Sequence, residues 1–273
     1  MMRRIISGKR LSSFLIAAVA FALLTPAITL AGEKEKISGE ITMATFSQYI
    51  SRGQELSRHS MAVQPYLGAS YGGFTLGLWG NWDSAPYDLA GGAAANAKWN
   101  EFNYTFSYGR SFGDLYLEGG YNYIDVIDAE DSQELIFKIR WDAAVTPEFT
   151  LYREVGHSSF WYASLKLSHQ IKLGEKAALD ISGSVSYLLG TDDARYPRID
   201  AGGSRMSESF RNFHDGNITV GLPVALTSQI TAKPTLSYVF PLTDDARQEM
   251  KWRSYRGEDN SFVVGGISLT YSF

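Results

Sequence analysis

The chain has 273 residues, a formal net charge of −4, no cysteine and an aromatic content of 14%. Without cysteine it has neither disulfides nor thiolate metal ligands, and an acidic chain offers no electrostatic attraction to nucleic acid. We therefore expect no nucleic-acid partner. The length allows one large domain or two smaller ones.

The first 31 residues differ in character from the rest of the chain. Four basic residues precede an unbroken apolar run at 14–24, and small Ala31 follows shortly after. This layout is typical of a cleaved secretory signal, and the run is shorter than the roughly 20 residues of a membrane-spanning helix. We predict a signal peptide over 1–31 and an exported domain over 32–273.

From residue 38 onward, segments of alternating apolar and polar residues recur. In "NEFNYTFSYG", for example, Tyr104 and Phe106 share one parity, while Asn103 and Thr105 share the other. A period of two predicts strands with one apolar and one polar face. In chain order, we predict strands over 38–50, 60–71, 74–83, 98–109, 114–125, 133–142, 148–156, 159–171, 177–189, 213–226, 229–240 and 261–273.

The predicted strands carry large aromatic residues on their apolar faces and run to about ten residues, the length that crosses a bilayer. A soluble β-sandwich is the alternative, but its strands are usually shorter. The connections alternate between short and long, the long ones including 84–97, 191–212 and 241–260. We therefore predict an all-β fold: a 12-stranded antiparallel transmembrane β-barrel with short periplasmic turns and long extracellular loops.

The final segment, "GGISLTYSF", alternates up to Phe273. Such regularity is expected if the last strand pairs with the first to close the barrel, because a frayed strand would expose an edge. We expect Phe273 to lie among the aromatic residues of the periplasmic interface. This ending also resembles the C-terminal signature that many outer-membrane barrels present to the barrel assembly machinery, which we accordingly expect as a partner.

Four stretches resemble the small proteobacterial outer-membrane proteins known as TorF-type porins. They are "YISRGQELS" (49–57), "VQPYLGASYGGFTLGLWGNWD" (63–83), "EFNYTFSYGRSFGDLYLEGGYNYID" (101–125) and "SFWYASLKLSHQIKLGEKAALDISGSVSYLLG" (159–190). The resemblance implies a transport role in the outer membrane of a Gram-negative bacterium, and it carries no catalytic residues. Independently of the resemblance, the predicted lipid-facing wall leads us to expect contact with outer-membrane lipid and lipopolysaccharide.

The polar faces of the predicted strands hold the candidate functional residues. Seven acids and four bases share the inward parity, so a water-filled pore is expected to favour cations slightly. Alternatively, the charges pair and fill the lumen, and we expect Glu118 and Lys138 to pair. The parity of the first strand is undetermined. The predicted pore-lining residues are Glu101, Glu118, Glu134, Lys138, Arg140, Asp142, Glu154, Lys166, Asp180, Asp215 and Lys233.

Two long outer loops contain the same pentapeptide, "TDDAR", at 191–195 and 243–247. Its acids are candidate Ca²⁺ ligands, but they lack the spacing of a calcium loop. A Thr that caps a short helix with an acidic first turn explains the pattern better. We predict no metal site and no cofactor.

Three further features admit functional roles. His157 precedes two serines, and an H-x-S pairing recurs in lipid-cleaving barrels. Arg52 and Arg58 fall in the first outer loop, where they either line the mouth, hold lipopolysaccharide phosphates or are simply solvated. Arg153 has the lipid-facing parity, which is tolerated near the headgroups.

From these observations we expect a narrow passive pore for small hydrophilic solutes. Two alternatives remain: a closed structural or ligand-binding barrel, and an outer-membrane hydrolase acting through His157.

Overall fold

We analysed a computed structural model, in which residues 36–57, 60–85, 97–127, 129–254 and 257–273 are described. The predicted signal peptide over 1–31 and most of the loop at 84–97 lie outside the described residues.

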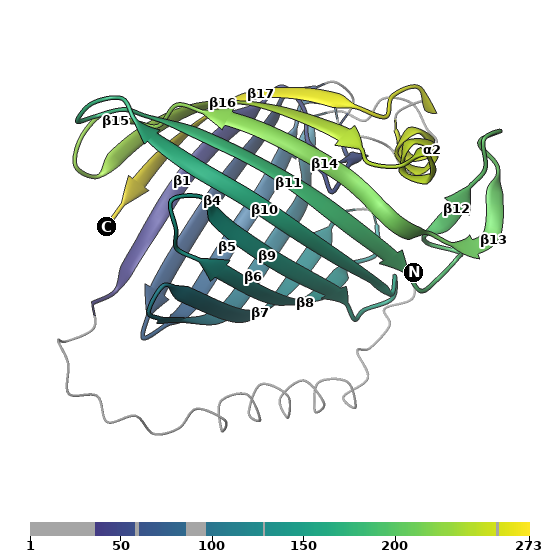
Figure 1. Ribbon diagram of the computed structural model, residues 1–273, viewed down its shortest axis with the longest axis horizontal. Coiled ribbons are helices and arrows are strands. Elements are labelled where there is room, and N and C mark those ends of the chain that lie inside the picture. Colours follow the sequence, from purple (N-terminus) through teal and green to yellow (C-terminus); the bar gives the residue numbers. More distant parts are fainter. Residues whose placement is uncertain (1–35, 58–59, 86–96, 128, 255–256) are drawn as a thin grey trace. The chain divides into compact units, whose positions relative to one another are not determined.

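Twelve antiparallel strands form a closed barrel, which confirms the predicted fold (Figure 1). In order, the strands are β1 (Ser38–Phe46), β4 (Ala62–Tyr71), β5 (Phe74–Asp83), β6 (Lys98–Phe112), β7 (Leu115–Val126), β8 (Ser132–Trp141), β9 (Thr146–Glu154), β10 (Phe160–Lys172), β11 (Ala178–Gly190), β14 (Arg211–Gly221), β16 (Ile230–Pro241) and β17 (Phe262–Ser272). Each strand pairs with its neighbours in this order.

The barrel closes between its first and last strands, as the regular final segment predicts. In the β1–β17 ladder, Ile41 lies opposite Tyr271 and Thr42 opposite Thr270. Beyond the ladder, the Gly39 amide donates to the Phe273 carbonyl at 2.9 Å, and the Phe273 amide donates back at 3.0 Å. The Phe273 ring stacks on Tyr271, with centroids 6.0 Å apart.

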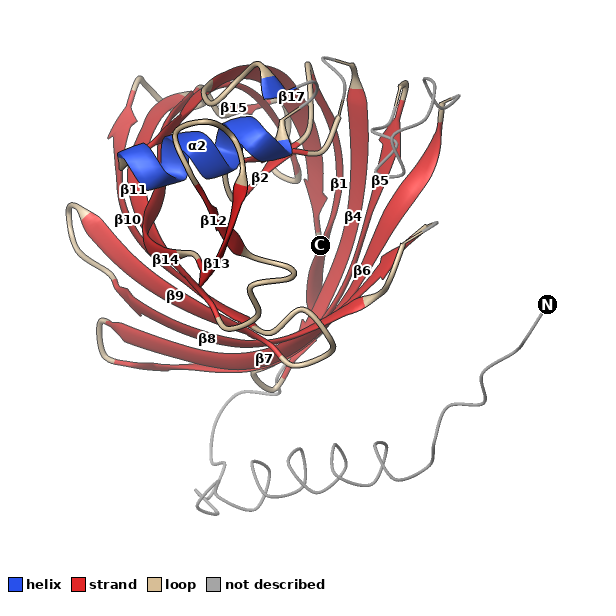
Figure 2. Cartoon of the chain, turned by 90° about the vertical axis from the view of Figure 1, so that its right-hand side faces the viewer, coloured by secondary structure: helices blue, strands red, loops and turns tan. Residues whose placement is uncertain are grey.

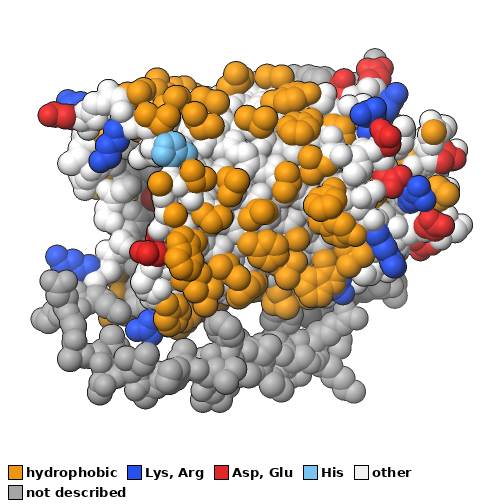
Figure 3. Space-filling model, in the orientation of Figure 1, with side chains coloured by type: hydrophobic (Ala, Val, Ile, Leu, Met, Phe, Trp, Pro, Cys, Tyr) orange, Lys and Arg blue, Asp and Glu red, His pale blue; other side chains and the backbone are white. Residues whose placement is uncertain are grey.

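The apolar rows of the strands face outward. Large residues on different strands are exposed, including Leu76, Phe106, Leu165, Leu236 and Ile267. Figure 3 shows apolar side chains spread over the middle of the barrel wall, with charged side chains gathered towards its two ends. A soluble sandwich would bury these rows between its sheets, whereas a membrane barrel presents them to lipid. The predicted orientation of the two faces is therefore correct.

The connections at one end are short, as in Gly72–Gly73 between β4 and β5. One predicted strand, 213–226, is interrupted near its end. The ladder of β14 ends at Gly221, because Pro223 has no amide hydrogen to continue it. A separate two-residue strand, β15 (Val224–Ala225), then pairs with β16.

The opposite end carries larger loops, visible in Figure 2. The first contains a small hairpin of β2 (Ile50–Ser51) and β3 (Gln54–Glu55), so the predicted strand 38–50 ends earlier, at Phe46. Another loop forms the hairpin of β12 (Pro197–Ile199) and β13 (Arg205–Ser209). The last contains helix α2 (Asp244–Arg253), which lies across part of the mouth. Among the described residues, no helix combines the length and apolar character needed to cross a membrane.

The two copies of "TDDAR" adopt different structures. In the second copy, Thr243 is the N-cap of α2 and its side chain accepts from the Ala246 amide at 3.1 Å, as the capping interpretation predicts. In the first copy, Asp192 instead accepts from the Ala194 amide at 2.9 Å within a turn. Within the described part of the chain, no group of three His, Cys, Asp or Glu side chains is placed to hold a metal ion.

Candidate functional site: a charged cavity inside the barrel

The first outer loop contributes to the interior of the barrel. Its hairpin turns at Arg52 and Gly53, whose φ angles of 49° and 73° are both left-handed. A two-residue type I′ turn, whose twist matches that of the flanking strands, requires positive φ at both of its central residues. On one side of the turn, Ile50 packs against the buried cluster of Val239, Met250 and Phe262. The hairpin is thus held between the barrel wall and α2.

The hairpin places Arg52 against the inner wall. Its two terminal nitrogens donate to the two carboxylate oxygens of Glu134 at 2.6 and 2.8 Å. The guanidinium carbon also lies 4.5, 5.1 and 5.4 Å from the ring centroids of Tyr152, Tyr162 and Phe160. Burial alone would lower the pKa of Arg52, but Glu134 raises it well above its ordinary value, so the side chain stays charged.

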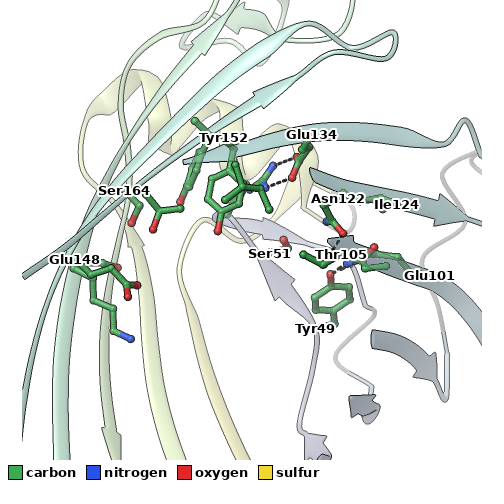
Figure 4. Close-up of a pocket in the computed structure, with 17 residues that line it drawn as sticks. Tyr49, Ser51, Glu101, Thr105, Asn122, Ile124, Glu134, Glu148, Tyr152 and Ser164 are labelled. Carbon is green, nitrogen blue, oxygen red and sulfur yellow. Dashed lines mark hydrogen bonds and ion pairs between the residues drawn. The ribbon is translucent and has the colours of Figure 1, made fainter. Parts of the chain in front are cut away.

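The Arg52–Glu134 contact borders a cavity of about 520 Å³ inside the barrel. Its lining is mostly polar and comes from the first loop and from strands β6 to β11 (Figure 4). The lining residues are Tyr49, Ser51, Arg52, Glu101, Asn103, Thr105, Asn122, Ile124, Glu134, Ile136, Glu148, Thr150, Tyr152, Tyr162, Ser164, Lys166 and Ser184. Three of the predicted pore-lining residues, Glu101, Glu134 and Lys166, therefore face one space.

Three charged groups of this cavity have no ion-pair partner among the described residues. Glu101 accepts a hydrogen bond from the Tyr49 hydroxyl at 3.2 Å. Glu148 and Lys166 are direct cross-strand neighbours on β9 and β10, yet their side chains form no ion pair within the described part of the chain. Figure 4 shows Glu148 on the opposite side of the cavity from Glu101 and Tyr49.

Other predicted residues of the polar faces form ion pairs. Glu118 and Lys138 make the expected contact, at 3.2 Å, and the Tyr116 hydroxyl also donates to Glu118 at 2.7 Å. Lys233 lies 2.5 Å from Asp180, and both line a second cavity of about 460 Å³ together with Lys166.

Arg140 and Asp142 pair at 2.8 Å. Asp142 lies just beyond the end of β8, where about half of its side chain is exposed. This pair therefore belongs to the rim at the short-turn end.

Glu154 is fully buried, contrary to the expectation that it lines the lumen. Its carboxylate accepts hydrogen bonds from the backbone amides of residues 156–159, at distances from 2.7 to 3.1 Å. The side chain therefore fixes the turn between β9 and β10, and a solute in the lumen cannot contact it. Carboxylates readily satisfy several amide groups in this way.

Asp215 is also buried rather than exposed to the lumen. It accepts hydrogen bonds from Ser186 at 2.7 Å and Tyr162 at 3.0 Å, and it lies 2.9 Å from Nδ1 of His214. The other imidazole nitrogen of His214 lies 2.9 Å from Glu249 on α2. These contacts tie the outer ends of the strands to the helix.

Arg253 pairs with Glu249 within α2 and also donates to the backbone carbonyl of Arg195 outside the helix at 2.6 Å. Burial alone would raise the pKa of Glu249, but Arg253 and His214 more than offset this and lower it to about 2. Glu249 is therefore ionised at any physiological pH. Helix α2 is thus held by the buried His214–Glu249 contact and, nearer the surface, by the contact of Arg198 with Asp245 at 3.2 Å.

The structure gives no support to a catalytic arrangement around His157. Its Nε2 lies 3.2 Å from Glu130, an exposed loop residue whose other partner is Arg195. Ser158 and Ser159 instead donate their backbone amides to Glu154. A second histidine of the barrel, His214, is fully buried among acids, where no substrate could reach it.

Several residues of the cavity were not predicted from the sequence. Glu148 has the same inward parity as Glu154, so alternation was the signal that could have identified it, although it stands at the very start of the predicted strand 148–156. The positions of Tyr49 and Arg52 in the cavity depend on the fold of the first loop, and the sequence of that loop has no periodic pattern that predicts it.

The two remaining arginines of the sequence analysis lie elsewhere. Arg58 lies outside the described residues. Arg153 lies over the Trp161 ring at 5.0 Å, in the outward row with Leu135.

Comparison with solved structures finds β-barrels of low sequence identity. The NanC porin is 11% identical with a TM-score of 0.53, over 86% of this chain and 98% of that chain. An outer-membrane channel from Pseudomonas putida F1 is 8% identical with a TM-score of 0.48, over 92% of this chain and 100% of that chain. No family model and no curated protein matches the sequence.

At such low identity, the likeness to the NanC porin concerns the fold alone. Together with the apolar outer wall, it shows that this chain has the fold of an outer-membrane β-barrel.

Proposed function

We propose that this protein is a narrow, porin-like channel for the passive diffusion of small hydrophilic solutes. The main support is the polar cavity of about 520 Å³ enclosed by a barrel whose outer wall is apolar. Such an interior would be an unfavourable core for a purely structural barrel, because buried charges require partners.

We further propose a slight preference for cations. Most lumenal charges are paired. Within the described ranges, the groups of the main cavity without an ion-pair partner are two carboxylates, Glu101 and Glu148, and one ammonium group, Lys166. The excess is one negative charge, smaller than the sequence count suggests. A preference that depends on so few groups should be weak and sensitive to salt.

The test is conductance of the purified protein in planar bilayers. Discrete current steps in KCl are expected, and a salt gradient should give a reversal potential of the sign expected for K⁺. Glu101→Gln should move the reversal potential towards zero. Glu175→Gln, in an exposed turn at the short-turn end, is the matched control and should leave the reversal potential unchanged. Anion selectivity in the unmodified protein would contradict the proposed preference.

A closed ligand-binding barrel is the second candidate, and one observation favours it. The Arg52 hairpin enters the lumen and α2 crosses part of the mouth. This candidate predicts that the unmodified protein gives no current in KCl, whereas a variant without residues 244–253 conducts. A hydrolase would require activity that is lost in His157→Ala.

The TorF-type resemblance remains a proposal about ancestry and is compatible with this transport role. We also propose outer-membrane lipid, lipopolysaccharide and the barrel assembly machinery as partners. Depletion of that machinery should reduce the folded, heat-modifiable form of the protein.

A further inference from the structure

Glu148 occupies an unusual position in the lumen. Its Cα is the direct cross-strand partner of Arg140 on β8 and of Lys166 on β10. Directly opposed residues on neighbouring strands have Cα atoms about 4.5–5.5 Å apart. A carboxylate between two cations would ordinarily pair with one of them.

Neither neighbour pairs with it. Arg140 turns towards Asp142, at 2.8 Å, and lies over the Tyr116 ring at 4.7 Å. Lys166 has no ion-pair partner among the described residues and projects into the same cavity as Glu148. Elsewhere in the lumen, by contrast, Glu118, Glu134 and Asp180 are paired. The cavity thus presents an adjacent carboxylate and ammonium group that both face open space.

The remaining surface of the cavity suits a small polar molecule. Near the two charges lie hydroxyl groups of Thr150, Ser164 and Ser184, and the aromatic ring of Tyr152. The volume of about 520 Å³ is in the range of small-molecule sites. The Arg52–Glu134 pair lines the same cavity and is internally neutral.

We propose that this cavity binds small zwitterions, of which free α-amino acids are the simplest class. The ammonium group of the solute would lie at Glu148 and its carboxylate at Lys166. A solute with only one charge satisfies one of these groups, whereas a zwitterion satisfies both and introduces no net charge. The inference rests on the proposed channel function and assigns its solute class.

The experiment compares isomers in swelling of proteoliposomes that contain the full-length mature protein. Glycine is a zwitterion, and glycolamide is its uncharged isomer, so the two differ in charge but hardly in size. Glycinamide and glycolate supply the cationic and anionic counterparts. Glycine is expected to enter faster than the other three, and to reduce the KCl current in planar bilayers with saturation.

Variants separate the pair from general effects of charge. Glu148→Gln and Lys166→Gln should each reduce the glycine-to-glycolamide rate ratio about fivefold, the effect of losing one charge-assisted contact partly screened by water. The double exchange of Glu148→Lys with Lys166→Glu should restore most of the ratio. Glu175→Gln and Lys176→Gln, both exposed at the short-turn end, are the matched controls.

The outcomes distinguish this inference from the channel function. If the unmodified protein conducts KCl but admits glycine and glycolamide equally, the zwitterion site is refuted while the channel stands. Faster entry of glycinamide than of glycine also refutes it, in favour of a cation site. If the protein conducts nothing and admits no solute, the proposed channel function itself fails.

Discussion

The contact between Arg52 and Glu134 offers the sharpest test of how the lumen is built. In Arg52→Ala, the bidentate ion pair at 2.6 and 2.8 Å and the stacking on three aromatic rings are lost together. Glu134 is 1% exposed, so its carboxylate is left without a counter-charge in a buried position.

The expected cost follows from these contacts. Removal of one partner from a buried ion pair destabilises a protein by about 3–5 kcal/mol. The side chain of Arg52 is 27% exposed, however, and water from the cavity can partly solvate Glu134 after the substitution. We therefore expect Arg52→Ala to lower the free energy of unfolding by about 3 kcal/mol.

The double variant Arg52→Ala with Glu134→Gln removes both charges. It should recover about 2 kcal/mol relative to the sum of the single variants, because the unpaired carboxylate is no longer present. Urea unfolding in detergent measures each free energy, since guanidinium chloride would itself bind Glu134. Arg153→Ala, on the outer face, is the matched control. If the changes in unfolding free energy of the two single variants simply add up in the double variant, the assigned contact between Arg52 and Glu134 is refuted.

Three other perturbations test separate parts of the structure. Leu165→Arg, on the outer face of β10, should destabilise insertion into lipid vesicles by about 2–4 kcal/mol, whereas Ser164→Arg on the inner face should cost far less; equal costs would contradict the assignment of faces. Gly53→Ala should cost about 1–3 kcal/mol in urea unfolding, because φ is +73° and a Cβ would lie 3.0 Å from that of Asp215. The pKa of Glu249 is lowered from 4.5 to about 2 in the folded state, so its stabilising contribution is complete above pH 4.5 and is lost as the pH falls towards 2. Hydrogen-exchange protection of α2 should therefore not fall between pH 7 and 5, and it should decline below pH 4.5. A decline already at pH 6 would show that Glu249 is not responsible.

The strands and their faces could be read from the sequence because each depends on a local, periodic signal. Alternation in "NEFNYTFSYG" sets which side chains face lipid, whatever the rest of the chain does. The same rule predicted the Glu118–Lys138 pair, because both residues have the inward parity and lie at similar depth on neighbouring strands. The proline at position 223, which has no amide hydrogen, divides the predicted strand 213–226 into β14 and β15 without changing its register against β16.

The alternation of the sequence by itself determined the barrel, its closure through the last strand and the polarity of its two walls. Only the tertiary structure decided what occupies the lumen. Arg52 and Glu134 are separated by 82 residues, and their contact depends on a hairpin with no periodic signal. The two copies of "TDDAR" fold differently, and the helix that follows the second is held by His214 through Glu249, a residue outside the pentapeptide. Polar parity places a side chain on the inner wall, but packing of distant loops decides whether it is paired, buried or free to meet a solute.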